Sequence, residues 1–131
     1  MKREVDMQLT LAADPAELGR VRQMVRAIGA TLRLPAAETN DMVLAVDEAC
    51  ANVVAHAYEP GHPERIMHVR AHTQADEVVF VVSDNGSPIV EGKSPGAGLG
   101  LRLIEGLSDQ LEIEGPGDDG TRLTIHFNLE R

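Results

Sequence analysis

The sequence DEACANVVAHAY occupies residues 47–58 of this 131-residue chain, in the second half of a predicted helix. Glu48, Asn52 and His56 are four residues apart, so successive members lie one turn apart on nearly one face. Their stripe lies beside the apolar stripe of the helix, which consists of Met42, Val46, Ala49, Val53 and Ala57. This placement predicts polar groups at the rim of a pocket, although the three residues alone are more typical of a solvated helix face.

Two residues of the polar stripe suit phosphate chemistry. The carboxylate of Glu48 accepts hydrogen bonds and can deprotonate a hydroxyl. The side-chain carbonyl of Asn52 is a hard oxygen ligand for Mg²⁺, which usually keeps waters and substrate phosphates as its other ligands. One turn of helix between a base and a metal ligand places both near a terminal phosphate.

The remaining chain predicts helices and paired strands. We expect helices at about 15–33, from Pro35 to about Tyr58, and at 101–107. We expect strands at 5–11, 66–72, 77–83, 110–114 and 122–129. Because the strands cluster in hairpins, the order predicts an α+β two-layer sandwich, with a mostly antiparallel mixed sheet and helices on one face. The length fits one domain over residues 1–131.

Composition excludes several classes of partner. The net charge of −9 argues against non-specific binding of nucleic acid and against docking on anionic lipid. The single cysteine, Cys50, allows no internal disulfide and is expected in the core. No apolar stretch approaches the roughly 18 residues of a membrane span, and the N-terminus is unlike a signal peptide. We therefore expect a cytoplasmic protein.

Three glycine-containing segments follow the second helix. Asp84-Asn85-Gly86 ends an apolar run and could bind the amine of adenine, although by itself it is good turn chemistry. Gly96-Ala97-Gly98-Leu99-Gly100 precedes a helix and could approach phosphates, or could be a surface loop. Gly120-Thr121 begins the last strand. The dinucleotide fingerprint and the P-loop both fail, because Leu101 and Ser87 stand where each needs glycine.

The order and spacing of these pieces are more specific than any one of them. Together they resemble the ATPase superfamily shared by DNA gyrase B, Hsp90, sensor histidine kinases and MutL. Residues 48–58 resemble its N box, 84–86 and 96–100 its two glycine boxes, and 120–121 its closing Gly-Thr motif. Residues 47–58 are similar to the stand-alone anti-sigma factor serine/threonine kinases of bacteria. Those proteins bind a sigma factor and phosphorylate a serine of an anti-anti-sigma protein.

The resemblance implies a histidine-kinase-like ATPase fold, Mg-ATP as the bound nucleotide, and residue roles. Glu48 would be the general base and Asn52 the Mg²⁺ ligand. Asp84 would bind the adenine amine, with Gly86 giving the base room and Thr121 assisting. The phosphate lid would be formed by Gly96, Gly98, Leu99 and Gly100. His56 and Tyr58 would have positioning roles. The first glycine box departs from the pattern, because Ser87-Pro88 follows Gly86.

The resemblance also implies partners: a sigma factor, an anti-anti-sigma protein as the substrate, and a second copy of the chain, paired through the strand at 5–11. Two alternatives remain open. The chain could be a non-catalytic module that binds ATP or only a protein partner. It could also be the catalytic domain of a two-component histidine kinase, although no phosphoacceptor helix pair is expected upstream of Met1.

Other charged residues give weaker indications. Arg22, Arg26 and Arg33 share a stripe that could meet an acidic partner, but a solvated helix face is the simpler interpretation. Lys93 or Arg102 could add positive charge near the phosphates. The histidines do not follow a convincing metal-ligand spacing, so we do not predict a metal site from them.

Overall fold

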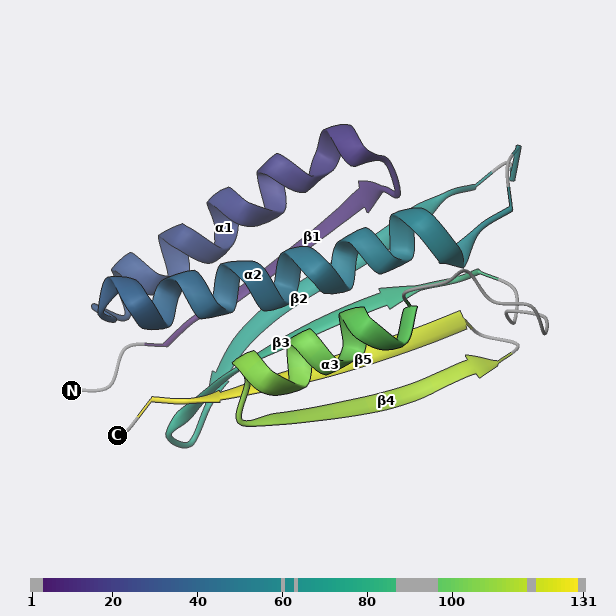
Figure 1. The fold of residues 1–131 in the computed structure, drawn as a ribbon. Helices are drawn as coiled ribbons and strands as arrows, with labels where there is room; N and C mark the ends of the chain where they lie inside the picture. Colours follow the sequence, from purple (N-terminus) through teal and green to yellow (C-terminus); the bar gives the residue numbers. More distant parts are fainter. Residues whose placement is uncertain (1–3, 60, 63, 87–96, 118–119, 130–131) are drawn as a thin grey trace.

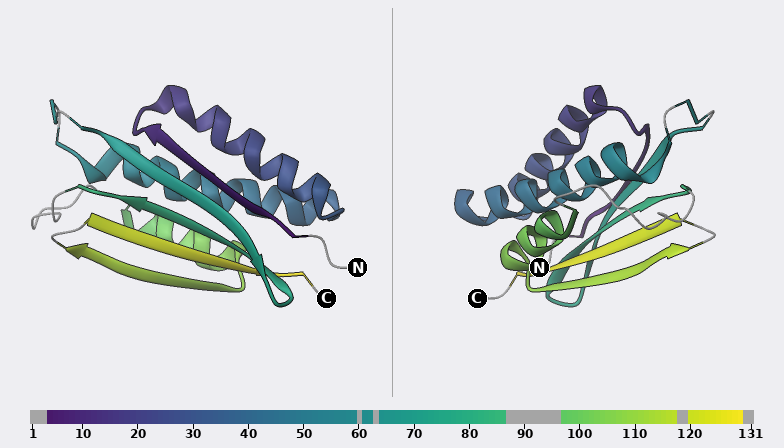
Figure 2. Two further views of the ribbon diagram at one scale, coloured as in Figure 1. Left: turned by 180° about the vertical axis from the view of Figure 1, so that it is seen from behind. Right: turned by 45° about the vertical axis from the view of Figure 1, so that its right-hand side comes forward.

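A computed structural model describes residues 4–59, 61–62, 64–86, 97–117 and 120–129. Helices cover one face of a five-stranded sheet, as Figures 1 and 2 show from three directions. The strands are β1 (Asp6–Ala12), β2 (Ile66–Gln74), β3 (Glu77–Asp84), β4 (Gln110–Gly117) and β5 (Gly120–Asn128). The helices are α1 (Leu18–Thr31), α2 (Ala36–Asn52) and α3 (Ala97–Leu107), with a 3₁₀ turn at Pro15–Glu17 and a π-helical turn at Val53–Ala57.

The sheet has the strand order β1-β2-β3-β5-β4, and every pair of neighbouring strands is antiparallel. The predicted two-layer α+β architecture is confirmed. The expectation of a mixed sheet is wrong for the described residues, because each strand runs opposite to its spatial neighbour. Between β3 and β5 the chain forms α3 and then β4, the edge strand that pairs with β5.

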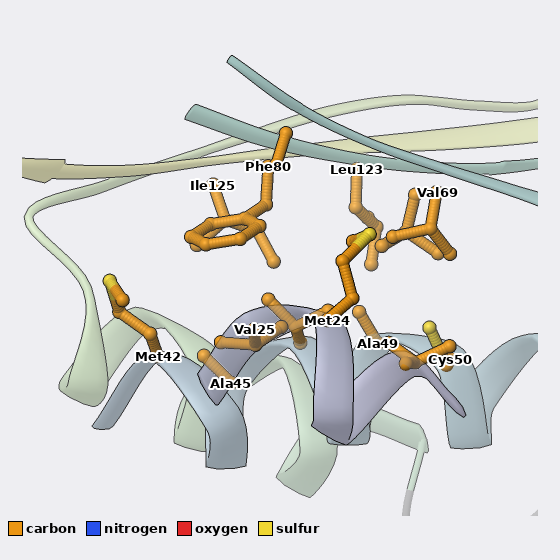
Figure 3. Close-up of a cluster of buried hydrophobic side chains, with 14 of the residues drawn as sticks. Met24, Val25, Met42, Ala45, Ala49, Cys50, Val69, Phe80, Leu123 and Ile125 are labelled. Carbon is orange, nitrogen blue, oxygen red and sulfur yellow. The ribbon is translucent and has the colours of Figure 1, made fainter. Parts of the chain in front are cut away.

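The core lies between the helices and the sheet (Figure 3). Phe80, Leu123 and Ile125 project from the sheet toward the helices, where Met42 and Ala49 of α2 are among the residues that meet them. Valines and other aliphatic side chains fill most of this layer, in agreement with the low aromatic content. Phe80, Leu123 and Ile125 are on the sheet face that the helices cover, because side chains alternate between the two faces along β3 and β5.

Local sequence accounts for the beginning of the first helical segment. The side chain of Asp14 accepts a hydrogen bond from the backbone N–H of Ala16 at 2.8 Å, and Pro15 occupies the first helical position. The helix predicted at 15–33 is present as the 3₁₀ turn followed by α1. It ends near Leu34, whose backbone N–H donates to the carbonyl of Gly29.

Two helix boundaries differ from the sequence prediction. The second helix is α-helical only to Asn52, and its last five residues form a π-helical turn. The third helix begins at Ala97 rather than at 101, so Gly98 and Gly100 lie in its first turn. Glycine has a weak intrinsic helix propensity, so the local sequence favours irregular backbone at these two positions. The packing of α3 against α2 outweighs this propensity.

The sheet face away from the helices carries a charged cluster around His126. Its Nδ1 lies 3.0 Å from Glu77 Oε1 and its Nε2 lies 3.2 Å from Glu112 Oε2, which connects β5 to both of its neighbours. Burial lowers the pKa of His126, but the hydrogen bonds and charges of the two carboxylates outweigh burial and raise it. The pKa of Glu77 is lowered, first by the hydrogen bond from Gln74 and also by His126.

Candidate functional site

The candidate site begins where the first turn of α3 packs against the C-terminal part of α2. A Cβ atom placed on Gly100 would lie 3.0 Å from Glu48 Oε1 and 3.2 Å from both side-chain atoms of the Asn52 amide. Glu48, Asn52 and the first turn of α3 therefore meet at one point. Figure 1 shows the two helices side by side, with the N-terminal end of α3 toward the C-terminal end of α2.

Glu48 and Asn52 are half-buried, and neither side chain forms a hydrogen bond or ion pair with another residue of the described part of the chain. A carboxylate and an amide that face a glycine, and that have no hydrogen-bond partner within the described ranges, fit a ligand that brings its own polar groups. The amide oxygen of Asn52 is of the kind that Mg²⁺ prefers. The residues present thus fit a magnesium–phosphate group.

A second group of residues surrounds the side chain of Asp84 at the end of β3. Asp84 Oδ1 accepts hydrogen bonds from the backbone N–H groups of Gly86 at 2.9 Å and Thr121 at 3.3 Å. The residue is only 6% exposed. Burial raises the pKa of this carboxyl, and the two backbone hydrogen bonds act in the opposite direction. One carboxylate oxygen is thus fixed by the backbone, which holds the group in one orientation at the C-terminal end of β3.

Two glycines allow the backbone to close around Asp84. A Cβ atom on Gly86 would overlap the carbonyl oxygen of Ala57. Gly120 has a φ of +88°, and a Cβ atom there would overlap the carbonyl oxygen of Asp84. The requirement for glycine at these positions comes from close backbone approach and, at Gly120, also from the left-handed conformation.

Tyr58 connects α2 to the Asp84 turn. Its hydroxyl donates to the carbonyl oxygen of Ile66 at 2.5 Å and accepts from the backbone N–H of Asn85 at 2.9 Å. Tyr58 is 6% exposed, and its ring contacts His62 at a centroid distance of 4.9 Å. The positioning role predicted for Tyr58 can be carried by this hydroxyl, which holds the backbone of Asn85 next to Asp84. His56 lies half-buried in the π-helical turn.

The other predicted lid residues are placed only in part. Gly98 and Leu99 belong to the first turn of α3. Gly96, Lys93 and Ser87-Pro88 lie outside the described residues. Arg102 is exposed on α3.

Sequence reasoning missed two contacts that support the site. The π-helical turn brings the carbonyl of Ala57 against Gly86, and its hydrogen-bond pattern has no recognisable sequence signal. Arg22 of α1 donates to Asp47 of α2 at 2.9 Å, immediately beside Glu48. The helical stripe of arginines was visible in the sequence, but the partner of Arg22 depends on how α1 packs against α2. Among the described residues, no cluster of three histidine, cysteine or acidic side chains could hold a metal ion.

A comparison with known protein families agrees with this arrangement. The model of the histidine kinase-like ATPase domain matches residues 11–127. The chain belongs to this ATPase family. The match includes α2, the Asp84 turn, α3 and the Gly120-Thr121 corner, so all the predicted motifs lie inside the family domain.

Individual proteins are similar to this chain over 67% to 100% of its length. The serine-protein kinase RsbW of Halalkalibacterium halodurans is 30% identical over 141 residues, covering 95% of this chain and 84% of that kinase. RsbW of Bacillus subtilis is 27% identical, covering 100% of this chain and 92% of that protein. The anti-sigma F factor of Clostridium kluyveri is 30% identical over 100 residues, covering 67% of this chain and 69% of that factor.

Solved structures with this ATPase fold match as well. A crystal structure of the RsbU and RsbW domains of a Mycobacterium tuberculosis protein has a TM-score of 0.77 at 25% identity, covering 97% of this chain. This chain spans 33% of that longer one. A histidine kinase domain from Erythrobacter litoralis has a TM-score of 0.62 at 22% identity, covering 87% of this chain and 60% of that one, which is a likeness of fold.

These comparisons confirm the predicted resemblance to the anti-sigma serine kinases and the predicted enzyme class, an ATP-dependent protein serine kinase. The histidine kinase domain, which would represent the alternative of a two-component catalytic domain, has a lower TM-score with this chain than the RsbU–RsbW structure has. No helix in the described ranges is both long and apolar enough to cross a membrane.

Proposed function

We propose that residues 1–131 act as one ATPase domain that binds Mg-ATP, phosphorylates a serine of an anti-anti-sigma protein and sequesters a sigma factor. The meeting of Glu48, Asn52 and Gly100 carries this proposal, because a base and a metal ligand face the same glycine-opened space. The names of the similar proteins, serine-protein kinase and anti-sigma F factor, support the two halves of the activity. We propose the cytoplasm as the location, because a sigma factor as a partner requires it.

Each part of the site has a role in this proposal. Asp84, held by Gly86 and Thr121, accepts a hydrogen bond from the adenine amine through its remaining acceptor capacity. Asn52 holds Mg²⁺, which supplies charge neutralisation to the phosphates when it is bound. The first turn of α3, with Gly98, Leu99 and Gly100, lies beside the phosphates in this proposal, whereas the fourth predicted lid residue, Gly96, is outside the described residues.

Glu48 acts on the acceptor hydroxyl. The serine oxygen forms a bond to the γ-phosphorus, the bond between that phosphorus and the bridging oxygen of ADP breaks, and the serine proton passes to the Glu48 carboxylate. The half-buried position of Glu48 limits its hydration without excluding a protein substrate. Phosphoryl transfer depends mainly on positioning and charge neutralisation, so this small set of groups is chemically sufficient.

The test mixes the protein with γ-labelled ATP, Mg²⁺ and anti-anti-sigma proteins encoded by the same organism. We expect one of them to be labelled on serine. Glu48→Gln should reduce transfer at least about 100-fold, as removal of a general base typically does, while ADP affinity changes little. Asp47→Asn is the matched control, because it removes the neighbouring carboxylate, which is paired with Arg22. Unchanged transfer by Glu48→Gln would contradict the base assignment, and tight partner binding without any transfer would favour a sequestering module.

We also propose that the protein is a homodimer. β1 is an edge strand with one neighbour, β2, in the described structure, so its second edge is available to another copy. Analytical ultracentrifugation at micromolar concentration tests this state, and a monomer at 100 μM would refute it.

A further inference from the structure

Large exposed apolar side chains are few in the described part of the chain, and two of them are one helical turn from Glu48 and Gly100 of the proposed site. The four such residues are Met7, Leu44, Leu103 and Ile113, which are 41%, 52%, 46% and 47% exposed. Leu44 precedes Glu48 by four residues, one turn along α2. Leu103 follows Gly100 by three residues, so both lie on the same side of α3, the side that meets Glu48.

The two helices run in opposite directions where they pack together (Figure 1). Moving from Glu48 toward the beginning of α2 therefore corresponds to moving from Gly100 toward the end of α3. Leu44 and Leu103 lie on this next turn of each helix, about 6 Å and about 4.5 Å from Glu48 and Gly100 along the respective axes. We call the surface between the two helices from Leu44 and Leu103 onward the α2–α3 seam.

The α2–α3 seam continues into a hollow of about 290 Å³. Its lining includes Asp41 and Met42 of α2 and Gly106 and Leu107 of α3, the next turn beyond Leu44 and Leu103. Asp41 is exposed, whereas Met42 is buried. The surface thus passes from the proposed base to two apolar side chains and then to a hollow whose lining includes the carboxylates of Glu38, Asp41 and Asp109.

We propose that the α2–α3 seam docks the segment of the phosphoacceptor protein that adjoins its reactive serine. This inference rests on the proposed kinase function. The serine oxygen must reach Glu48, so the polypeptide that carries it must cover the neighbouring turn of α2, where Leu44 is. Exposed apolar side chains that lie together mark interaction sites, and Leu44 and Leu103 occupy adjoining turns of two helices that pack against each other. The docked segment carries an apolar side chain for Leu44 and Leu103, and a basic side chain that meets Asp41.

The experiment uses the protein that the wild-type enzyme phosphorylates with γ-labelled ATP, and measures KM for that protein, kcat, and the Kd for ADP. Leu44→Gln and Leu103→Gln should each raise KM about fivefold, because each loses the burial of about half of a leucine side chain. Asp41→Asn should raise KM about twofold and weaken its salt dependence. The Kd for ADP should stay within a factor of two in all three variants.

Matched controls make the result specific. Ile113→Gln removes an apolar side chain of the same exposure from β4, and it should leave KM unchanged. Leu44→Met and Leu103→Met keep the apolar character and should keep KM near the wild-type value. Unchanged KM in both glutamine variants, or an equal rise in Ile113→Gln, overturns the docking proposal while leaving the kinase function intact. If the wild type phosphorylates no protein, the proposed function fails and this inference fails with it.

Discussion

Removal of one hydroxyl group, in Tyr58→Phe, should weaken both the fold and nucleotide binding. This hydroxyl bridges the carbonyl of Ile66 and the backbone N–H of Asn85, while the ring is almost fully buried. Each bond contributes about 0.5–1.5 kcal/mol, and a buried partner left without a bond costs about 1–3 kcal/mol. Phenylalanine preserves the ring, so we expect the free energy of unfolding to fall by about 2 kcal/mol.

The consequence for binding follows from the position of Asn85. It lies between Asp84, the proposed adenine-binding carboxylate, and Gly86, which donates to that carboxylate. Without its bond to Tyr58, the backbone at Asn85 loses the contact that ties it to the end of α2. We expect the Kd for ADP to rise about threefold to tenfold, since the turn must be ordered when nucleotide binds.

Thr73→Val is a matched control for Tyr58→Phe. The Thr73 hydroxyl also connects two backbone groups, accepting from the N–H of Val5 at 3.0 Å and lying 3.5 Å from its carbonyl oxygen. These contacts join β2 to the residue before β1, at the end of the β2–β3 pair opposite to Asp84. The control should lose stability without losing ADP affinity.

Urea denaturation followed by circular dichroism gives the stability of both variants, and isothermal titration calorimetry gives the Kd for ADP. A loss of stability below about 0.5 kcal/mol in Tyr58→Phe would refute the energetic reasoning, because that is the lower limit for a single bond. An equal change in ADP affinity in both variants would refute the coupling between the Tyr58 hydroxyl and the adenine site.

Three further predictions test other contacts. Gly100→Ala should weaken ADP binding in the presence of Mg²⁺ at least about tenfold, because its Cβ would lie 3.0 Å from the Glu48 carboxylate. Gly106→Ala is the control, because there is open space around Gly106: it should keep ADP affinity and add up to about 1 kcal/mol of stability by helix propensity. Calorimetry measures the affinities and urea denaturation the stabilities. The pKa of His126 is raised in the fold, so its contribution to stability is fully present below the unfolded pKa of 6.5 and is lost as the pH rises through the folded pKa. Urea denaturation between pH 6 and 9 should therefore show a fall in the free energy of unfolding that is smaller in His126→Asn. An identical fall in the variant would contradict this prediction. Burial, with the charge of Asp47, raises the pKa of Cys50 to about 12, so a maleimide should label it at pH 8 only in denaturant, and rapid labelling of the native protein would show that the helix opens.

Much of this protein is determined by its sequence alone. The four-residue spacing of Glu48, Asn52 and His56, with the glycine segments that follow in order, was enough to predict the ATPase family that the comparisons confirmed. Alternating and helical periodicities located all five strands and three helices, because side-chain burial on one face imposes those periods. The roles given to individual site residues stay predictions.

Other features depend on contacts between segments that are distant in the chain. Gly98 and Gly100 read locally as loop residues, but α3 extends over them because Gly100 fits against Glu48 and Asn52 of α2. The π-helical turn and the Tyr58 hydroxyl bridge could not be predicted, since each joins the end of α2 to the turn after β3, 27 residues away at Asn85. The stretch at 47–58 thus specifies which groups are present, and the packing of α2 against α3 and the sheet decides what they face.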